Sequence, residues 1–207
     1  YAKLWVRVRD PKRSKMLPTY ERVKAMAEGA AIMANVDYEI SLVSGIYETL
    51  VNRSGGEIMQ NNLELLGPIS YTEEETAFGK AIQKATGKAE VGMDSKIYPL
   101  KETEENPGGG STDVGDVSWN VPNINLGVTV APKDTPWHSW AVVACGGMSI
   151  GHKGMIYAGK ALGMTAVDLF ENPKMITKVK EEFKMRKGDE VYKPMIEGPP
   201  PIPVSGN

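Results

Sequence analysis

The chain of 207 residues contains a single cysteine, Cys145, so it cannot form an internal disulfide framework. So low a cysteine content is typical of proteins from a reducing compartment, and we expect a cytoplasmic protein. Cys145 lies in an apolar run without a neighbouring basic residue. This setting favours an inert buried thiol over a nucleophile.

The sequence also lacks an excess of positive charge and a long hydrophobic run. It has 24 Lys and Arg against 26 Asp and Glu, and its net charge is −2. This balance offers no basic footprint for nucleic acid and no polybasic anchor for a membrane surface. No uncharged run reaches the roughly 20 apolar residues that a membrane-spanning helix needs. We therefore expect neither nucleic acid nor membrane as a partner.

The first residues show neither an initial Met nor the pattern of a signal peptide. Residues 2–9 instead alternate from the outset, with Leu4, Val6 and Val8 on the apolar side, which is typical of a half-buried strand. We expect an incomplete chain that begins inside a longer protein.

Hydrophobic periodicity predicts both strands and helices. Alternation predicts strands at 2–9 and 36–45, with a helix over 19–35 between them, and the apolar segment 124–132 predicts a buried strand. Further helices are expected at 57–66, 71–87, 150–170 and 172–186. Thr72 and Glu75 predict a capping box for the second of these, and Asn172 and Pro173 an N-cap and first helical residue for the last. Residues 133–149 are expected to form a loop that becomes apolar. The residues alone thus indicate an α/β protein.

A glycine-rich stretch, "GGGSTDVGDVSWNVP" (108–122), is unusually dense in hydroxyls and carboxylates. No Lys follows the glycines at the spacing of a phosphate-binding loop, and the spacing of Gly108, Gly110 and Gly115 does not match a dinucleotide fingerprint. A dinucleotide-binding module would also need a strand before Gly108, where the sequence is charged. A tight loop, in which Asp113 or Ser111 caps the following turn, is the simpler interpretation.

The two histidines, His138 and His152, are rare enough to be informative. His138 lies in "TPWHSW" between Trp137 and Trp140, where a neutral imidazole could ligate a metal ion. A hydrogen-bonded core or interface histidine is the alternative. His152 begins a predicted helix, where it could equally be a packing residue of the first turn. No complete metal-binding motif is present locally, and the paired glutamates are expected to be solvated.

Three stretches in order resemble a known family: 108–122, "TPWHSW" and "SIGHKGMIYAGKALGMTAVDLF". They are similar to the C-terminal half of one subunit type of the aminobenzoyl-glutamate hydrolases. These proteins belong to the dinuclear metal amidohydrolases and carboxypeptidases, which include aminoacylases. The segments "AKLWVRVRDP" and "LVNRSGGEIMQNNLELLGP" resemble the second half of the family's lid and the return to its catalytic domain.

The resemblance implies an α/β fold made of an α+β lid portion and part of a mixed-sheet α/β catalytic domain. Residues 1–50 would be the second half of a lid or dimerisation domain, and residues 51–207 the C-terminal part of a metal-dependent catalytic domain. The family holds two divalent metal ions, zinc or manganese, mainly through residues that precede the lid. His138 is the metal ligand expected in this chain, with His152 as runner-up. No catalytic residue is assigned, because the general-base glutamate is not in this chain.

Other site residues follow from the same resemblance. Arg9 and Asn52 are expected to bind substrate, although Arg9 could be a solvated strand end and Asn52 could cap a turn. Residues Ser111, Thr112 and Asp113 are expected to hold metal ligands or substrate by hydrogen bonds.

The function implied is metal-dependent hydrolysis of the amide bond of an aryl- or acyl-glutamate. The expected partners are a small substrate with a terminal carboxylate, a second copy bound through the lid, and a second hydrolase subunit. The alternative is a non-catalytic fragment that contributes dimerisation or partner binding.

Overall fold

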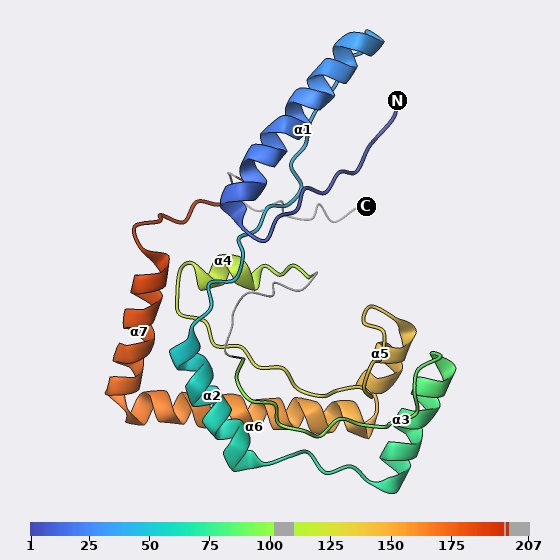
Figure 1. Cartoon of the computed structure of the whole chain (residues 1–207), viewed down its shortest axis with the longest axis vertical. Helices are drawn as coiled ribbons and strands as arrows, with labels where there is room; N and C mark the ends of the chain where they lie inside the picture. The colour runs from blue at the N-terminus through green and yellow to red at the C-terminus, as the bar shows by residue number, and fades with distance from the viewer. Residues whose placement is uncertain (102–109, 197, 199–207) are drawn as a thin grey trace, which may run out of the picture. The chain divides into compact units, whose positions relative to one another are not determined.

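The computed structural model describes residues 1–101, 110–196 and 198. Within these residues it forms seven α-helices joined by extended chain (Figure 1). The helices are α1 (Arg13–Ala34), α2 (Arg53–Leu66), α3 (Glu73–Ala85), α4 (Val114–Ser118), α5 (Trp140–Gly146), α6 (Ser149–Glu171) and α7 (Pro173–Lys187). Gly108 and Gly109, which begin the glycine-rich stretch, lie outside the described residues.

The chain divides into two compact units. Unit 1 consists of 1–51, 103–121 and 186–207, and unit 2 consists of 52–102 and 122–185. The assignment of a lid to residues 1–50 and of a catalytic part to 51–207 stays a prediction.

The predicted α/β fold with a mixed sheet is wrong for this structure, because none of the described residues belongs to a β-strand. Segments 2–9, 36–45 and 124–132 are non-helical but are not paired in a ladder. Alternation predicts which side chains share a face, whereas a strand also needs main-chain hydrogen bonds to a neighbour. Leu4 is 88% exposed and Val6 is 62% exposed, so this apolar face is largely uncovered by the described residues.

The helices agree better with the sequence. Thr72 and Glu75 form the predicted capping box of α3, with each side chain bonded to the main chain of the other residue. Helix α6 matches its predicted range closely, and α7 begins at Pro173 as expected. Helix α1 starts well before residue 19 and contains Pro18.

The core of unit 2 joins α3, α5 and α6 through Ile82, Ala141, Cys145 and Ile150. Helix α5 falls where the sequence predicted a loop. Ala141 and Cys145 are four residues apart and both fully buried, so they form the inner face of this short helix. Cys145 is buried, as predicted, and burial raises the pKa of its thiol, which disfavours the reactive thiolate.

Helix α6 also packs against α2. The side-chain amide of Asn62 donates to Thr165 Oγ1 at 3.1 Å and to Asp168 Oδ2 at 2.7 Å. Among the helices of the described residues, none is both long and apolar enough to cross a membrane.

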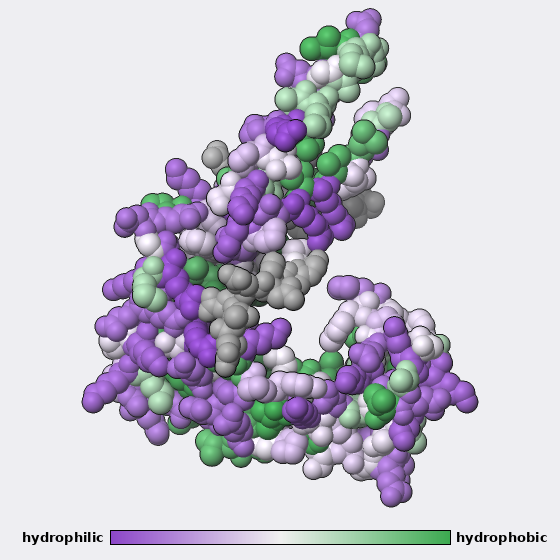
Figure 2. Space-filling model, in the orientation of Figure 1, coloured by the Kyte–Doolittle hydropathy of each residue, from purple (hydrophilic) through white to green (hydrophobic). Residues whose placement is uncertain are grey.

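In unit 1, the C-terminal end of α1 carries exposed apolar side chains. Ile32 and Met33 are largely exposed, and Figure 2 shows hydrophobic surface at this end of the helix. The described residues therefore leave the end of α1 without an apolar covering.

Candidate functional site

His138 lies in unit 2, at the exposed tip of the loop that leads into α5. Its φ of 59° is in the left-handed region, which few non-glycine residues adopt. The loop is bonded to itself, since Thr135 Oγ1 donates to Pro132 O at 2.6 Å and Ser139 Oγ donates to Pro136 O at 2.5 Å. These bonds hold the backbone on both sides of the imidazole.

Gln83 of α3 anchors the beginning of this loop. Its side chain is fully buried, and its amide Nε2 donates to Lys133 O at 2.9 Å and to Gly92 O at 3.3 Å. Its Oε1 accepts from the N–H of Gly92 at 2.8 Å. One buried amide therefore joins two segments that are far apart in the sequence, and it positions the chain that carries His138.

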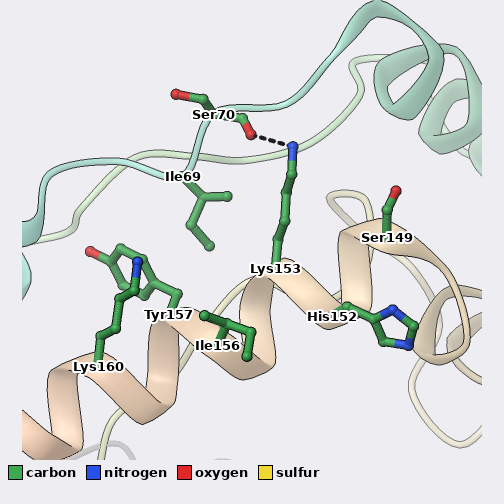
Figure 3. Close-up of a pocket in the computed structure, with 8 residues that line it drawn as sticks. All are labelled: Ile69, Ser70, Ser149, His152, Lys153, Ile156, Tyr157 and Lys160. Carbon is green, nitrogen blue, oxygen red and sulfur yellow. Dashed lines mark hydrogen bonds between the residues drawn. The ribbon is translucent and has the colours of Figure 1, made fainter.

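His152 lies in the first turn of α6 and lines a shallow hollow of about 450 Å³ (Figure 3). The lining residues are Ile69, Ser70, Ser149, His152, Lys153, Ile156, Tyr157 and Lys160. His138 is not among them. The hollow is not a ready cation site, because basic side chains line it.

Lys153, inside this hollow, is held by two acceptors. Its Nζ donates to Ser70 O at 2.8 Å, as Figure 3 shows, and to Glu75 Oε2 at 2.6 Å. The hydrogen bond from Lys153 is the largest cause that lowers the pKa of Glu75 from 4.5 to about 2, followed by bonds from the Thr72 main chain and Ser149. The expectation of a merely solvated glutamate is therefore wrong for Glu75.

Glu182 of α7 departs from the same expectation. Its carboxylate accepts from the main-chain N–H groups of Arg53 at 2.9 Å and Ser54 at 2.6 Å. These are donors of the first turn of α2, which have no partner within their own helix. A glutamate distant in sequence therefore caps α2, which no local spacing could reveal.

Asn52 is the N-cap of α2 and is 6% exposed. Its Oδ1 accepts from the N–H of Gly55 at 2.8 Å, and its Nδ2 donates to Val179 O at 2.8 Å. Both ends of the amide thus bond the main chain, in agreement with the capping alternative. Substrate binding by Asn52 stays a prediction.

Residues 110–121 of the glycine-rich stretch lie in unit 1, where Ser111, Thr112 and Asp113 are exposed. Asp113 occupies the N-cap position of α4, but its side chain bonds no main-chain N–H of the helix. The Thr112 hydroxyl instead accepts from the N–H of Val114 at 3.3 Å. The capping predicted for Asp113 is therefore wrong in its detail.

Arg9 is also in unit 1 and is exposed, whereas Asn52 and both histidines are in unit 2. The predicted site residues are thus divided between the two units. Within the part of the chain that the structure describes, no group of three or more His, Cys, Asp or Glu residues could hold a metal ion.

The chain is similar to one of the subunits of a hydrolase. It shares 29% identity over 209 residues with a p-aminobenzoyl-glutamate hydrolase subunit of Escherichia coli (strain K12). The alignment covers 89% of this chain and 44% of the E. coli protein, so the chain spans less than half the length of this curated relative. No family model matches the chain, and no solved structure matches it. The resemblance that the sequence motifs indicated is confirmed, and with it the relationship to a hydrolase.

Proposed function

We propose that this chain is part of an enzyme that hydrolyses the amide bond of an aryl- or acyl-glutamate. The alignment with the E. coli hydrolase carries this proposal, because it extends over most of the chain. His138 is the residue of this chain to which we assign a role in it, because its imidazole is exposed on a loop that is held by hydrogen bonds on both sides. The proposed location is the cytoplasm, on the grounds of the single cysteine.

The proposal includes zinc or manganese, with His138 as one ligand. A stable site for such an ion takes about four ligands, and catalytic zinc sites usually take three from the protein. The described residues expose two imidazoles, His138 and His152, and assemble no group of three or more His, Cys, Asp or Glu around either of them. These residues alone therefore do not fit a two-metal centre, so the proposal assigns the other ligands to polypeptide outside this chain.

The experiment that tests the proposal is hydrolysis of p-aminobenzoyl-glutamate by the intact protein that carries this chain. Replacing a residue that only hydrogen-bonds a metal ligand typically lowers activity by about 10- to 100-fold. Because His138 is proposed as a ligand itself, His138→Ala should lower the activity by at least ~100-fold. His152→Ala tests the runner-up ligand, and if His138 is the ligand the activity of this variant should stay within a few-fold of the wild type. Equal activity of the wild type and His138→Ala would refute the assignment of His138.

A second candidate function is a non-catalytic role in assembly. The E. coli relative is named as one of the subunits of a hydrolase, and the described residues of unit 1 leave Leu4, Ile32 and Met33 exposed. Apolar surface of this kind is typical of interfaces. Association without hydrolysis, measured by sedimentation and product release on the same intact protein, would favour this alternative.

A further inference from the structure

A short segment that follows α7 closes over a buried tyrosine of unit 1. Tyr47 is 4% exposed, and the ring of Tyr192 lies against it with 5.0 Å between the ring centroids. The Tyr47 hydroxyl accepts from the main-chain N–H of Lys193 at 3.1 Å. Met195 lies directly on Gly45, because a Cβ on this glycine would be 2.5 Å from the Met195 Sδ atom. Three residues of the late segment thus pack along the chain around Tyr47.

The same segment holds the beginning of α1. Arg13, the first residue of this helix, donates from Nη2 to Lys193 O at 2.9 Å, and its Cζ atom lies 3.9 Å from the centroid of the Tyr47 ring. Asp116 of α4 bonds both aromatic residues, since its Oδ1 accepts from the Tyr192 hydroxyl at 2.9 Å and its Oδ2 from the N–H of Tyr47 at 3.3 Å. The late segment is therefore joined to α1 and to α4 through one buried ring.

The chain that leads to these contacts is exposed. Gly188 directly follows α7 and has a φ of 58°, which lies in the left-handed region that favours glycine. Residues 188–191 are all exposed, and the contacts described above begin at Tyr192. Segments with few buried contacts and solvent-exposed backbone open at a lower free energy than the core around them. Gly188 and the residues after it thus provide a hinge for the segment that Tyr192 anchors.

We propose that residues 189–195, the strap, form a releasable latch of unit 1. When the strap is closed, it buries Tyr47 and holds Arg13, so that the start of α1 stays beside the segment around Tyr47. When the strap opens about Gly188, Tyr47 loses the ring that covers it, and Arg13 loses its main-chain acceptor. Opening of the strap therefore frees the start of α1 before unit 1 unfolds. This inference is independent of the proposed function, because every contact that carries it lies within unit 1.

Native-state hydrogen exchange on the 207-residue chain, followed by NMR at single amides, tests the latch. Three reporter amides are bonded only while the strap is closed or directly beside its contacts: Lys193 bonds the Tyr47 hydroxyl, Tyr47 bonds Asp116, and Arg13 bonds Glu48. These amides should exchange through one opening with a small dependence on urea, because opening the strap exposes little surface. The reference amide is Leu50, which bonds the buried Ser118 hydroxyl and should stay protected until unit 1 unfolds.

Substitutions at Tyr192 make the test specific. Tyr192→Phe keeps the ring and loses the bond to Asp116, so exchange at the three reporter amides should become about 2- to 10-fold faster. Tyr192→Ala also loses the aromatic contact, and exchange should become at least about 10-fold faster. Tyr98→Phe is the matched control, because it removes a tyrosine hydroxyl bonded to Asp94 in unit 2 and should leave the reporter amides unchanged.

The pattern among these amides decides the proposal. Equal acceleration at Lys193, Tyr47 and Arg13, with no change at Leu50, supports the latch. If Tyr192→Ala accelerates exchange at Lys193 alone, the segment frays without releasing its partners and the latch is refuted. Acceleration at Leu50 by the same factor would show that unit 1 opens only as a whole, and four unchanged rates would show that Tyr192 does not hold the strap; both results also overturn the inference.

Discussion

The hydroxyl oxygen of Ser118 accepts a hydrogen bond of 2.8 Å from the main-chain N–H of Leu50. Next to it, the indole N–H of Trp119 donates to Glu48 O at 2.8 Å, and Asp116 Oδ2 accepts from the N–H of Tyr47 at 3.3 Å. Helix α4 and the residue after it thus bond the main chain of Tyr47, Glu48 and Leu50, which belong to one extended segment. The second half of the glycine-rich stretch therefore has a structural role within unit 1.

Ser118→Ala should destabilise unit 1 through this contact. Ser118 is fully buried, and its removal leaves the N–H of Leu50 without its acceptor, which costs about 1–3 kcal/mol. Urea unfolding gives the free energy, and hydrogen exchange at Leu50 should become faster. Asn120→Ala, on an exposed residue nearby, should change stability by no more than about 0.5 kcal/mol. An unchanged exchange rate at Leu50 would contradict the importance of this bond.

The pH dependence of unit 2 should reflect Glu75. The pKa of this carboxyl is about 2 in the folded chain against 4.5 for the free group. A lowered pKa means that the stabilisation is complete above about pH 4.5 and is lost as the pH falls towards 2. Glu75→Gln should flatten the loss of stability in this window, measured by thermal unfolding at a series of pH values. The control is Glu73→Gln on the same turn, whose curve should follow the wild type. If the stability of Glu75→Gln fell with pH in the same way as that of the wild type, the Lys153–Glu75 pair would not control the acid stability.

Two substitutions can show whether Asn52 only caps α2 or also binds substrate. Asn52→Ala removes the cap of α2 and should cost about 0.5–2 kcal/mol in the free energy of unfolding. Asn52→Ser keeps a side-chain oxygen that can accept from Gly55 and loses the donor to Val179 O without burying a charge, so it should lose less stability. If Asn52 also binds substrate, Asn52→Ser should raise KM in the intact protein while the helix remains capped. An unchanged KM would restrict Asn52 to its structural role.

Local signals predicted the longer helices but missed α4 and α5. The capping box of Thr72 and Glu75 and the Asn172–Pro173 start of α7 depend on spacings of one to three residues, which are visible in the sequence. Strand formation depends on a distant partner, so the alternation of residues 2–9 could not establish a sheet. Helix α5 was missed because seven mostly apolar residues show no clear period.

The candidate site was only partly visible for the same reason. His138 could be selected because histidine is scarce in this chain and two indoles flank it. The contact from Gln83 to Lys133 spans fifty residues, and that from Glu182 to the start of α2 is longer still. Such contacts are fixed by tertiary packing, which no motif in a single sequence encodes.

Substitution by Ala at two glycines of α6, Gly154 and Gly159, should change the stability of the chain in opposite directions. A Cβ on Gly154 would lie 2.5 Å from Thr129 O and 2.7 Å from Val130 Cγ1, so Gly154→Ala should cost about 1–3 kcal/mol through overpacking. A Cβ on Gly159 meets nothing within 4 Å, and Ala in a helix interior is better than Gly by about 0.5–1 kcal/mol. Gly159→Ala should therefore stabilise the chain. Chemical denaturation of both variants in one buffer measures the difference, and hydrogen exchange along residues 129–131 locates it. Destabilisation by Gly159→Ala would mean that this side of α6 is covered in solution by something that the described residues do not include.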